Sequence, residues 1–261
     1  MIRLFRNNRV LIAAMVGRSL KARFAGTMMG MLWAIFLPLA QACIYTFVFS
    51  VIMHAKSEGA YQQVPFPIWL LTGLLPWTMF AEALGLAARA ITGNVHLVKK
   101  TMFDKKVLPL CSVLTSLVNH GFALIILLAV MLFYGLRPGW SILFLPLVSF
   151  VMFLFILAWA YIVAAFNVFL RDIDQLLGVV LNIGFFATPI VYSATLAPSA
   201  FRFIFKMNPF FYFVNFYREI ILLNKLPDIF TLFMLTSGIL LFFAIAVRQF
   251  EALAPEFADS L

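Results

Sequence analysis

Few residues in this sequence are placed to do catalytic chemistry. The three histidines, His54, His96 and His120, are far apart and form no H-E-x-x-H zinc motif. The aspartates at positions 104, 172, 174, 228 and 259 lie outside the long apolar segments, which argues against an intramembrane aspartyl protease. No G-x-S-x-G elbow and no G-x-x-x-x-G-K-[ST] phosphate loop occurs. We therefore expect no catalytic residue, no metal site and no cofactor in this chain.

Two ionisable residues and a histidine interrupt apolar stretches. Glu82 and Arg89 are seven residues apart, about two turns along one helix face. They could form an ion pair at the entrance of a pathway, because ionisable groups in membrane segments are costly and often functional. They could equally be a structural pair or side chains that reach the membrane interface. His120, beside Asn119, is expected to be a hydrogen-bonded packing residue and not a proton relay.

The composition places these residues in a membrane protein. Of 261 residues, 64% are hydrophobic and 11% are charged, too few charges to cover the surface of a soluble domain. The net charge of +9 would suit a nucleic-acid-binding protein, but the 19 Lys and Arg residues gather at the ends of uncharged segments, as topology signals do. We expect these charges to meet membrane lipid and not nucleic acid.

Six segments are long and apolar enough to cross a bilayer as helices, which predicts an all-α integral membrane protein with a single transmembrane domain, 1–261. The segments are 24–53, 59–81, 107–136, 138–170, 175–201 and 229–247. Basic residues before the first span and after the second predict cytoplasmic termini and an interfacial helix over residues 1–25. The expected outer segment opposes this orientation with four basic residues, Arg202, Lys206, Arg218 and Lys225.

A ladder of small residues repeats at every fourth position: Ala22, Gly26, Gly30 and Ala34. Such spacing lets helices approach closely, within one subunit or between two subunits. It equally suits a flexible elbow between the interfacial segment and the first span, because glycine accepts backbone conformations that other residues avoid.

The expected outer segment, 194–226, is predicted to contain two short aromatic helices, 199–206 and 209–224. Asn208 is the expected N-cap of the second helix, with Pro209 at its first position. The pair is too short to form two spans. It is therefore expected to dip into the membrane and lid an exit, or to lie on the outer leaflet as a hairpin.

Five segments carry a family resemblance that covers essentially the whole chain. They are KARFAGTMMGMLWAIFLPLAQACIYTFVFSVI (21–52), FPIWLLTGLLPWTMFAEAL (66–84), KKVLPL (105–110), NVFLRDIDQLLGVVLNIGFFATPIVYS (167–193) and MNPFFYFVNFYREIIL (207–222). Together they resemble the permease subunit of polysaccharide-exporting ABC transporters, a type-2 family that exports capsule, O-antigen or teichoic acid chains. One departure is visible: the family often has Phe-Pro-Arg before the third span, where this chain has Phe103-Asp104-Lys105.

The resemblance implies a homodimer of six-span subunits in the bacterial inner membrane, each with a re-entrant extracytoplasmic helix pair before the last span. Two copies of a separate cytoplasmic ABC ATPase would bind ATP and Mg²⁺. A coupling helix within residues 95–106 would dock on that ATPase, with the candidate residues His96, Lys99, Lys100, Phe103, Asp104 and Lys105. The substrate would be a lipid-linked or lipid-terminated polysaccharide, and envelope-spanning export proteins are further candidate partners.

Aromatic side chains are the candidate contacts of the polymer, because the C–H faces of sugars slide over rings without the deep wells that direct hydrogen bonds create. The resemblance implicates the first and fifth spans as the conduit, with Tyr45, Phe49, Phe185, Phe186 and Tyr192. The candidate extracytoplasmic gate consists of Phe205, Phe211, Tyr212, Tyr217 and Arg218.

Two other functions fit the same sequence. A drug or lipid efflux permease of the same superfamily would be favoured by a narrow, closed interface in place of a wide, ring-lined conduit. A membrane-embedded enzyme of lipid-linked sugar metabolism would be favoured by activity of the purified chain without an ATPase. The missing catalytic constellation argues against the enzyme.

Overall fold

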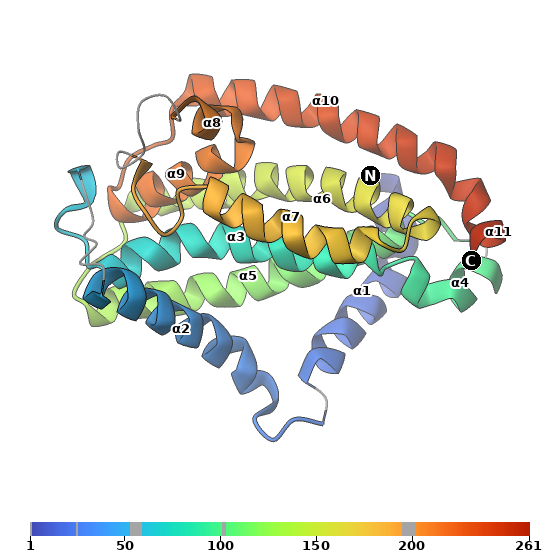
Figure 1. The fold of residues 1–261 in the computed structure, drawn as a ribbon, viewed down its shortest axis with the longest axis horizontal. Helices are drawn as coiled ribbons and strands as arrows, with labels where there is room; N and C mark the ends of the chain where they lie inside the picture. The colour runs from blue at the N-terminus through green and yellow to red at the C-terminus, as the bar shows by residue number, and fades with distance from the viewer. Residues whose placement is uncertain (1, 25, 53–58, 101–102, 195–201) are drawn as a thin grey trace.

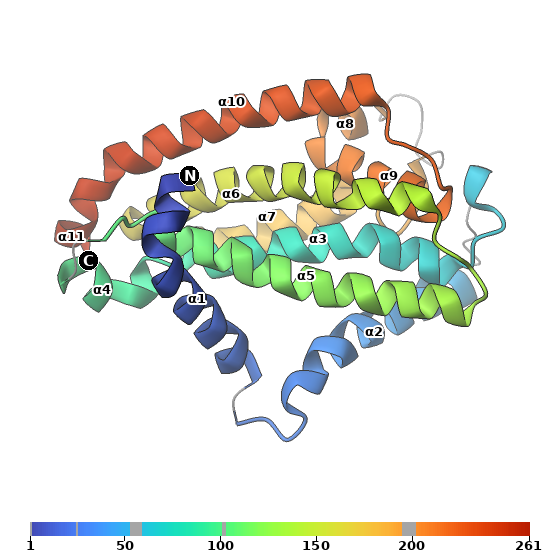
Figure 2. The ribbon, with the colours of Figure 1, turned by 180° about the vertical axis from the view of Figure 1, so that it is seen from behind.

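The computed structural model describes residues 2–24, 26–52, 59–100, 103–194 and 202–261, and the regular elements in these ranges are helices (Figures 1 and 2). The predicted all-α class is therefore confirmed for the described chain. His54 and residues 195–201 of the expected outer segment lie outside the described residues, as do the side chains of Phe49 and Lys100.

Four helices in the described chain are long and apolar enough to cross a bilayer. They are α3 (Phe66–Ala88), α5 (Val107–Phe133), α6 (Leu145–Phe169), which follows a 3-10 stretch (Trp140–Phe144), and α10 (Ile229–Leu253). α3 packs against α5, α6 and α9 (Pro209–Leu222), while α10 lies along α6 (Figure 1). These helices can face lipid because they contain long runs without a charged residue. Each helix also satisfies its own backbone hydrogen bonds, which lipid cannot do.

The first and fifth predicted spans are shorter in the structure. α2 (Trp33–Tyr45) continues as a π-helix over Thr46–Ile52. α7 (Ile173–Ala187) ends before Thr188, which has an extended backbone with ψ 131°. Because a residue that precedes proline is driven out of the helical region, Pro189 ends the helix that apolar composition predicts to continue to residue 201.

The N-terminal helices form a V at the edge of the bundle. α1 (Ile2–Phe24) packs against α5 and buries Ile12, and the chain then turns into α2 (Figure 2). Gly26 and Gly30 have φ angles of +76° and +51°, and a Cβ at either would meet no atom within 4 Å. The small-residue ladder therefore lies at a turn between α1 and α2, as the elbow interpretation predicts, and neither glycine packs closely against the described chain, while a seam between two subunits stays a prediction.

Short helices lie at opposite ends of the bundle. α4 (Val95–Lys100) contacts α11 (Phe257–Ser260) at one end, named here the α4 end (Figure 1). α8 (Arg202–Met207) and α9 lie at the other, named the α9 end. The backbone N–H of Phe210 donates to Asn208 Oδ1 at 2.9 Å, with Pro209 as the first residue of α9. The predicted cap and the second short helix are thus confirmed.

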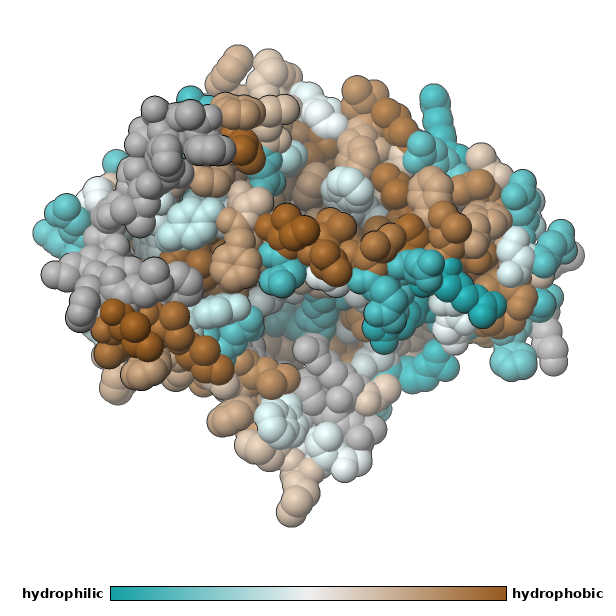
Figure 3. All heavy atoms as spheres, in the orientation of Figure 1, coloured by the Kyte–Doolittle hydropathy of each residue, from teal (hydrophilic) through white to brown (hydrophobic). Residues whose placement is uncertain are grey.

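The exposed side of α7 is apolar along its length. Leu176, Val179, Val180, Ile183 and Phe186 are each more than half exposed. Figure 3 shows this apolar strip along α7, with hydrophilic atoms gathered toward the α4 end. In water such a strip would be unfavourable, so it belongs against lipid or another apolar surface.

Asp228 caps α10 and makes the folded state sensitive to acid. Its Oδ2 accepts hydrogen bonds from the hydroxyl of Thr231 at 2.5 Å and from the Thr231 backbone N–H at 2.9 Å. These bonds lower the pKa of Asp228 from its usual value of 3.8. A lowered pKa stabilises the fold above the unfolded-state value, and this contribution is lost as the pH falls through the folded-state value.

We therefore expect Asp228→Asn, which keeps an acceptor oxygen but cannot titrate, to flatten the acid dependence of stability. The thermal midpoint of the detergent-solubilised protein, measured between about pH 5 and pH 3, should fall less in this variant than in the natural protein. Parallel curves for the two proteins would contradict the expectation.

Candidate functional site

A chain of ring contacts crosses the bundle and is named here the aromatic layer. Tyr45 on α2 stacks on Phe185 of α7 with centroids 5.7 Å apart and planes 23° apart. Phe185 in turn lies 5.9 Å from Trp77 of α3. The contacts continue through α9, α6 and α10 by way of Phe210, Phe80, Phe155, Phe242 and Trp159. Ring pairs at these distances attract beyond their burial, so the layer ties six helices together.

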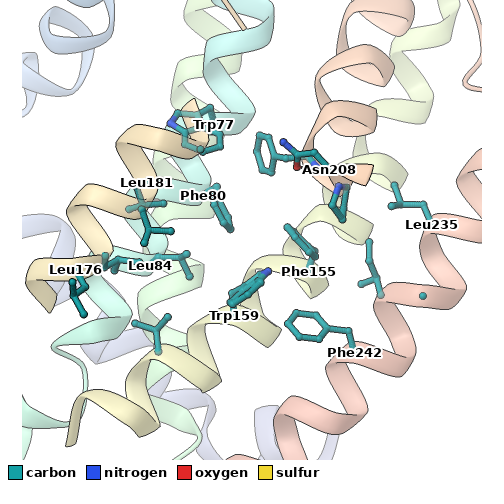
Figure 4. A pocket seen from close by; sticks show the side chains of 18 of the residues that line it. Trp77, Phe80, Leu84, Phe155, Trp159, Leu176, Leu181, Asn208, Leu235 and Phe242 are labelled. Atoms are coloured by element: carbon teal, nitrogen blue, oxygen red, sulfur yellow. Dashed lines mark hydrogen bonds between the residues drawn. The ribbon is translucent and has the colours of Figure 1, made fainter. Parts of the chain in front are cut away.

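A large apolar cavity opens beside this layer. Its volume is about 840 Å³, and it lies between α3, α6, α7, α9 and α10. Trp77, Phe80, Phe155, Trp159 and Phe242 contribute ring walls, with leucines of α7 and α10 on either side and Asn208 near one end (Figure 4). With walls of hydrocarbon and rings, the cavity suits an apolar occupant better than a charged one.

Gly184 permits the close contact between α7 and the layer. A Cβ at this position would lie 2.9 Å from the ring of Trp77. Real Cβ atoms do not approach other atoms so closely, so a larger residue would push α7 away from α3. The glycine therefore lets Trp77 reach Phe185.

The structure brings three of the candidate conduit residues together. Tyr45 and the buried Phe185 stack, and Phe186 lies 5.1 Å from Phe185 with its own ring more than half exposed. Tyr192 lies beyond the end of α7, where its hydroxyl donates to the carbonyl of Phe186 at 2.5 Å. Its ring is 6.2 Å from Phe205 of α8, so Tyr192 joins the conduit candidates to the gate candidates.

The candidate gate residues fall into two sets. Phe205 and Phe211 stack with centroids 6.3 Å apart, and the Tyr212 hydroxyl donates to the Lys206 carbonyl at 2.9 Å. Tyr217 and Arg218 instead lie buried among the helices. The sequence grouped these residues because they are adjacent in the chain, but α9 turns them toward different surroundings.

Arg218 is a buried guanidinium without an ion pair in the described chain. Its Nη1 and Nη2 donate to the carbonyls of Pro189 and Ile190, at 3.0 and 2.7 Å. The group lies 3.7 Å from the centroid of the Trp69 ring, which attracts a cation through its π face. Arg218 thus links the segment after α7 to α3 and α9, and its guanidinium does not face lipid headgroups.

Tyr217 is the centre of a buried polar network. Its hydroxyl lies 2.8 Å from Nε2 of His120 on α5 and 2.7 Å from the Ser149 hydroxyl on α6. The three side chains connect α5, α6 and α9 inside apolar surroundings, where an unmade hydrogen bond is costly. The prediction that His120 is a hydrogen-bonded packing residue agrees with this geometry.

The candidate coupling residues differ in exposure. His96 and Lys99 on α4 and the following Asp104 are exposed, and Phe103 is half-buried. Lys105 points back into the chain, where its Nζ donates to the carbonyl of Ala254 at 2.6 Å. The exposed residues are available to a partner, whereas Lys105 binds the end of α10.

Lys106 adds a second link between α5 and α10. It forms ion pairs with Glu251 of α10 and, at 3.3 Å, with Asp104. Burial lowers the pKa of Lys106, but the hydrogen bonds and charges of Glu251 and Asp104 outweigh it and raise the pKa overall. The loop that follows α4 is therefore fixed to the C-terminal region of the chain.

Glu82 and Arg89 do not pair with each other. The amide of Asn119 donates to Glu82 Oε1 at 2.6 Å, and Arg89 Nε bonds the carboxylate of Asp174 at 3.0 Å. The ion-pair interpretation of Glu82 and Arg89 is therefore wrong, because Asp174 is brought next to Arg89 from 85 residues away.

Sequence reasoning missed most of the aromatic layer. Trp77 and Phe80 are three residues apart on α3, a spacing that places both on one helix face. Phe210 directly follows Asn208 and Pro209, which predict the start of α9 and therefore the helix that carries this ring. Phe155 and Phe242 carried no such signal among 31 phenylalanines.

Comparisons with known proteins agree on one family. The profile of the ABC-2 type transporter family matches residues 10–222. The O-antigen export system permease protein RfbA of Myxococcus xanthus is 34% identical over 267 residues, which cover 100% of both chains. A Klebsiella pneumoniae protein of the same name is 28% identical over 96% of this chain and 95% of its own. The polysialic acid transport protein KpsM of Escherichia coli is 32% identical over 34% of this chain and 33% of its own. On this full-length likeness, the chain belongs to the ABC-2 type transporter family.

Proposed function

We propose that this chain is the membrane-spanning subunit of an ATP-driven exporter that moves a polysaccharide, such as O-antigen or capsule, across the bacterial inner membrane. The observation that carries this proposal is the end-to-end similarity to an O-antigen export permease. The partial match to a polysialic acid transport protein points to the same class of substrate. The chain supplies the path, and an ATPase on another chain supplies ATP hydrolysis.

The arrangement we propose has two copies of this chain and two copies of the ATPase. Each copy would have six spans, with α2 and its π-helix as the first, α7 and the segment after it as the fifth, and α8 and α9 as the re-entrant pair. The α4 end would face the cytoplasm, since basic side chains such as Arg89, Lys99 and Arg171 are exposed there. Both termini would be cytoplasmic, and the exposed residues His96, Lys99 and Asp104 would meet the ATPase.

The polymer would pass along the aromatic side chains at the start of the aromatic layer. Tyr45, Phe185 and Phe186 come from the two segments proposed to line the conduit, and they contact one another. Rings offer sugars a broad, shallow attraction, which lets a long chain move step by step. Tyr192, Phe205 and Phe211 would surround the outer end of this path.

Depletion of the chain in its own bacterium tests the function. We expect long-chain polysaccharide to accumulate inside the cell while the cell surface loses it. Immunoblotting of cell fractions and surface labelling of intact cells would report the two pools. A normal surface polymer after complete depletion would exclude the proposal and turn attention to drug or lipid efflux, for which accumulation of a labelled drug or lipid would be measured next.

A substitution at Phe185 tests the conduit. Phe185→Leu keeps an apolar side chain but removes the ring that contacts Tyr45, Trp77 and Phe186. We expect export to fall about tenfold, because each lost ring contact is worth roughly 0.5–1.5 kcal/mol and these contacts hold Tyr45 and α7 in place along the proposed conduit. The control is Phe233→Leu on α10, where the side chain is 63% exposed. Equal export by the two variants would remove Phe185 from the conduit.

A further inference from the structure

Three helix ends meet on one side chain at the α4 end. Asn167 lies in the last turn of α6 and is 3% exposed. Its amide nitrogen donates to the carbonyl of Ala88 at 2.8 Å, and its amide oxygen accepts from the backbone N–H of Asp174 at 3.1 Å. Ala88 is the last residue of α3, and Asp174 is the second residue of α7.

Both backbone groups need a partner that their own helix cannot supply. The last four carbonyls of a helix have no intrahelical donor, and the first four N–H groups have no intrahelical acceptor. Asn167 satisfies one group of each kind at the same time, because its amide carries both a donor and an acceptor, whereas a carboxylate only accepts and an apolar side chain does neither. The ends of α3 and α7 are thereby held to α6 and to each other.

A second contact joins α3 and α7 directly. Arg89, which follows α3, bonds both carboxylate oxygens of Asp174 through Nε, at 3.1 and 3.0 Å. Its side chain is 72% exposed, so this ion pair adds modestly to what Asn167 provides. We name Asn167, Arg89 and Asp174 the Asn167 joint.

The joint is connected to α4 by a short, hydrogen-bonded turn. The N–H of Gly93 donates to the Arg89 carbonyl at 2.8 Å, and the Asn94 amide donates to the Ala90 carbonyl at 2.8 Å. α4 begins at the next residue, Val95. A displacement of α4 would therefore move the end of α3. Through the joint it would also move the start of α7, the helix on which Phe185 and Phe186 lie.

We propose that the Asn167 joint transmits the movement of α4 to α7 during the transport cycle. This inference rests on the proposed function, in which α4 meets the ATPase and α7 lines the conduit. Asn167, Arg89 and Asp174 are positioning residues in this scheme, because they act on α7 and not on the polymer. The joint explains why a polar residue, Asn167, stands at the end of the long apolar helix α6.

The first test measures movement of α7 in the complete complex with the ATPase. A spin label at Val179→Cys, an exposed α7 position, reports the distance between the two copies, in a background that carries Cys43→Ser. We expect a non-hydrolysable ATP analogue to shift this distance in the otherwise natural chain and to leave it unchanged when Asn167→Ala is added. A shift of the same size in the Asn167→Ala complex would overturn the inference, whatever the substrate proves to be.

The second test measures polymer exported per ATP hydrolysed. Asn167→Ala is expected to lower this ratio about tenfold, as the loss of about 1.4 kcal/mol of coupling would. The single charge reversals Arg89→Asp and Asp174→Arg are expected to lower it less, about threefold, because the Arg89 side chain is largely exposed. The double reversal should recover part of the ratio. The control is Arg171→Asp, a charge reversal at an exposed residue between α6 and α7.

Outcomes of the two tests separate a transmission role from a structural one. If the variants lower the amount of complex in the membrane but leave the ratio of polymer to ATP unchanged, the residues only stabilise the fold and the inference is wrong. It is equally wrong if Arg171→Asp lowers the ratio as much as Arg89→Asp. If the Asn167→Ala complex does not assemble, the single and double charge reversals at Arg89 and Asp174 distinguish a transmission role from a structural one. Failure of the proposed function would be seen separately, as normal surface polysaccharide in cells that lack the chain.

Discussion

Replacing Gly73 with alanine is expected to destabilise the chain and to lower export about tenfold, because the new methyl group would displace Arg218. A Cβ on Gly73 would lie 2.7 Å from Nη2 of Arg218, which is the atom that donates to the carbonyl of Ile190. Overpacking of this kind costs about 1–3 kcal/mol. Displacement would also leave buried carbonyls without donors, at about 1–3 kcal/mol each. The segment that follows α7 would then lose its attachment to α3.

Two comparisons isolate this cause. Gly85→Ala is on the same helix, and its added Cβ would meet no atom within 4 Å, so it should be neutral or slightly stabilising. Arg218→Met should resemble Gly73→Ala, and the double variant should be no worse than Arg218→Met alone, since the two changes remove the same contacts. Thermal midpoints in detergent and surface polysaccharide in cells would be measured. Strict additivity of the two changes would show that Gly73 acts through something other than Arg218.

Tyr217→Phe is expected to destabilise the chain by about 2–5 kcal/mol, although it removes a single oxygen atom. That oxygen serves both the buried His120 on α5 and the half-buried Ser149 on α6, and Tyr217 itself is fully buried. Without it, a buried imidazole and a half-buried hydroxyl each lose one hydrogen-bond partner. The thermal midpoint of the solubilised protein would report the loss.

Tyr212→Phe is the matched control for this experiment. Tyr212 is a half-buried residue that also lies on α9 and also loses one hydroxyl hydrogen bond, to the Lys206 carbonyl at 2.9 Å, but this bond is exposed, so water can replace it. We expect its midpoint to stay close to that of the natural protein. If both phenylalanine variants lose the same stability, the buried network contributes nothing beyond an ordinary surface hydrogen bond.

The elements of this protein were predictable where a local signal sets them. Long uncharged segments predict α3, α5, α6 and α10, because only a helix satisfies its backbone groups within the hydrocarbon core. Asn208 followed by Pro209 predicts the start of α9, since both residues act on the first turn alone. The family-typical string that begins at Asn167 was recognisable, but its physical purpose was not.

Contacts between distant residues were not predictable in the same way. Their seven-residue spacing places Glu82 and Arg89 on one helix face, yet Arg89 bonds Asp174 and Glu82 accepts from Asn119. Similarly, adjacency in the chain grouped Tyr217 and Arg218 with Phe211 and Tyr212 as gate residues, although the first pair is buried in the bundle. A helix separates neighbours in sequence by about 100° around its axis, so neighbours need not share surroundings.

The sequence by itself determined the all-α membrane class, the four long helices and the family resemblance. For the glycine ladder it left two alternatives, an elbow or a helix-packing seam. Tertiary structure decided that the ladder lies at a turn between α1 and α2, that Arg218 donates to the carbonyls of Pro189 and Ile190, and that Asn167 joins three helix ends. The physical reason is the range of the interactions. Apolar composition and capping act within a few residues, whereas a buried polar group is satisfied by whichever donor or acceptor the packing of the helices brings to it.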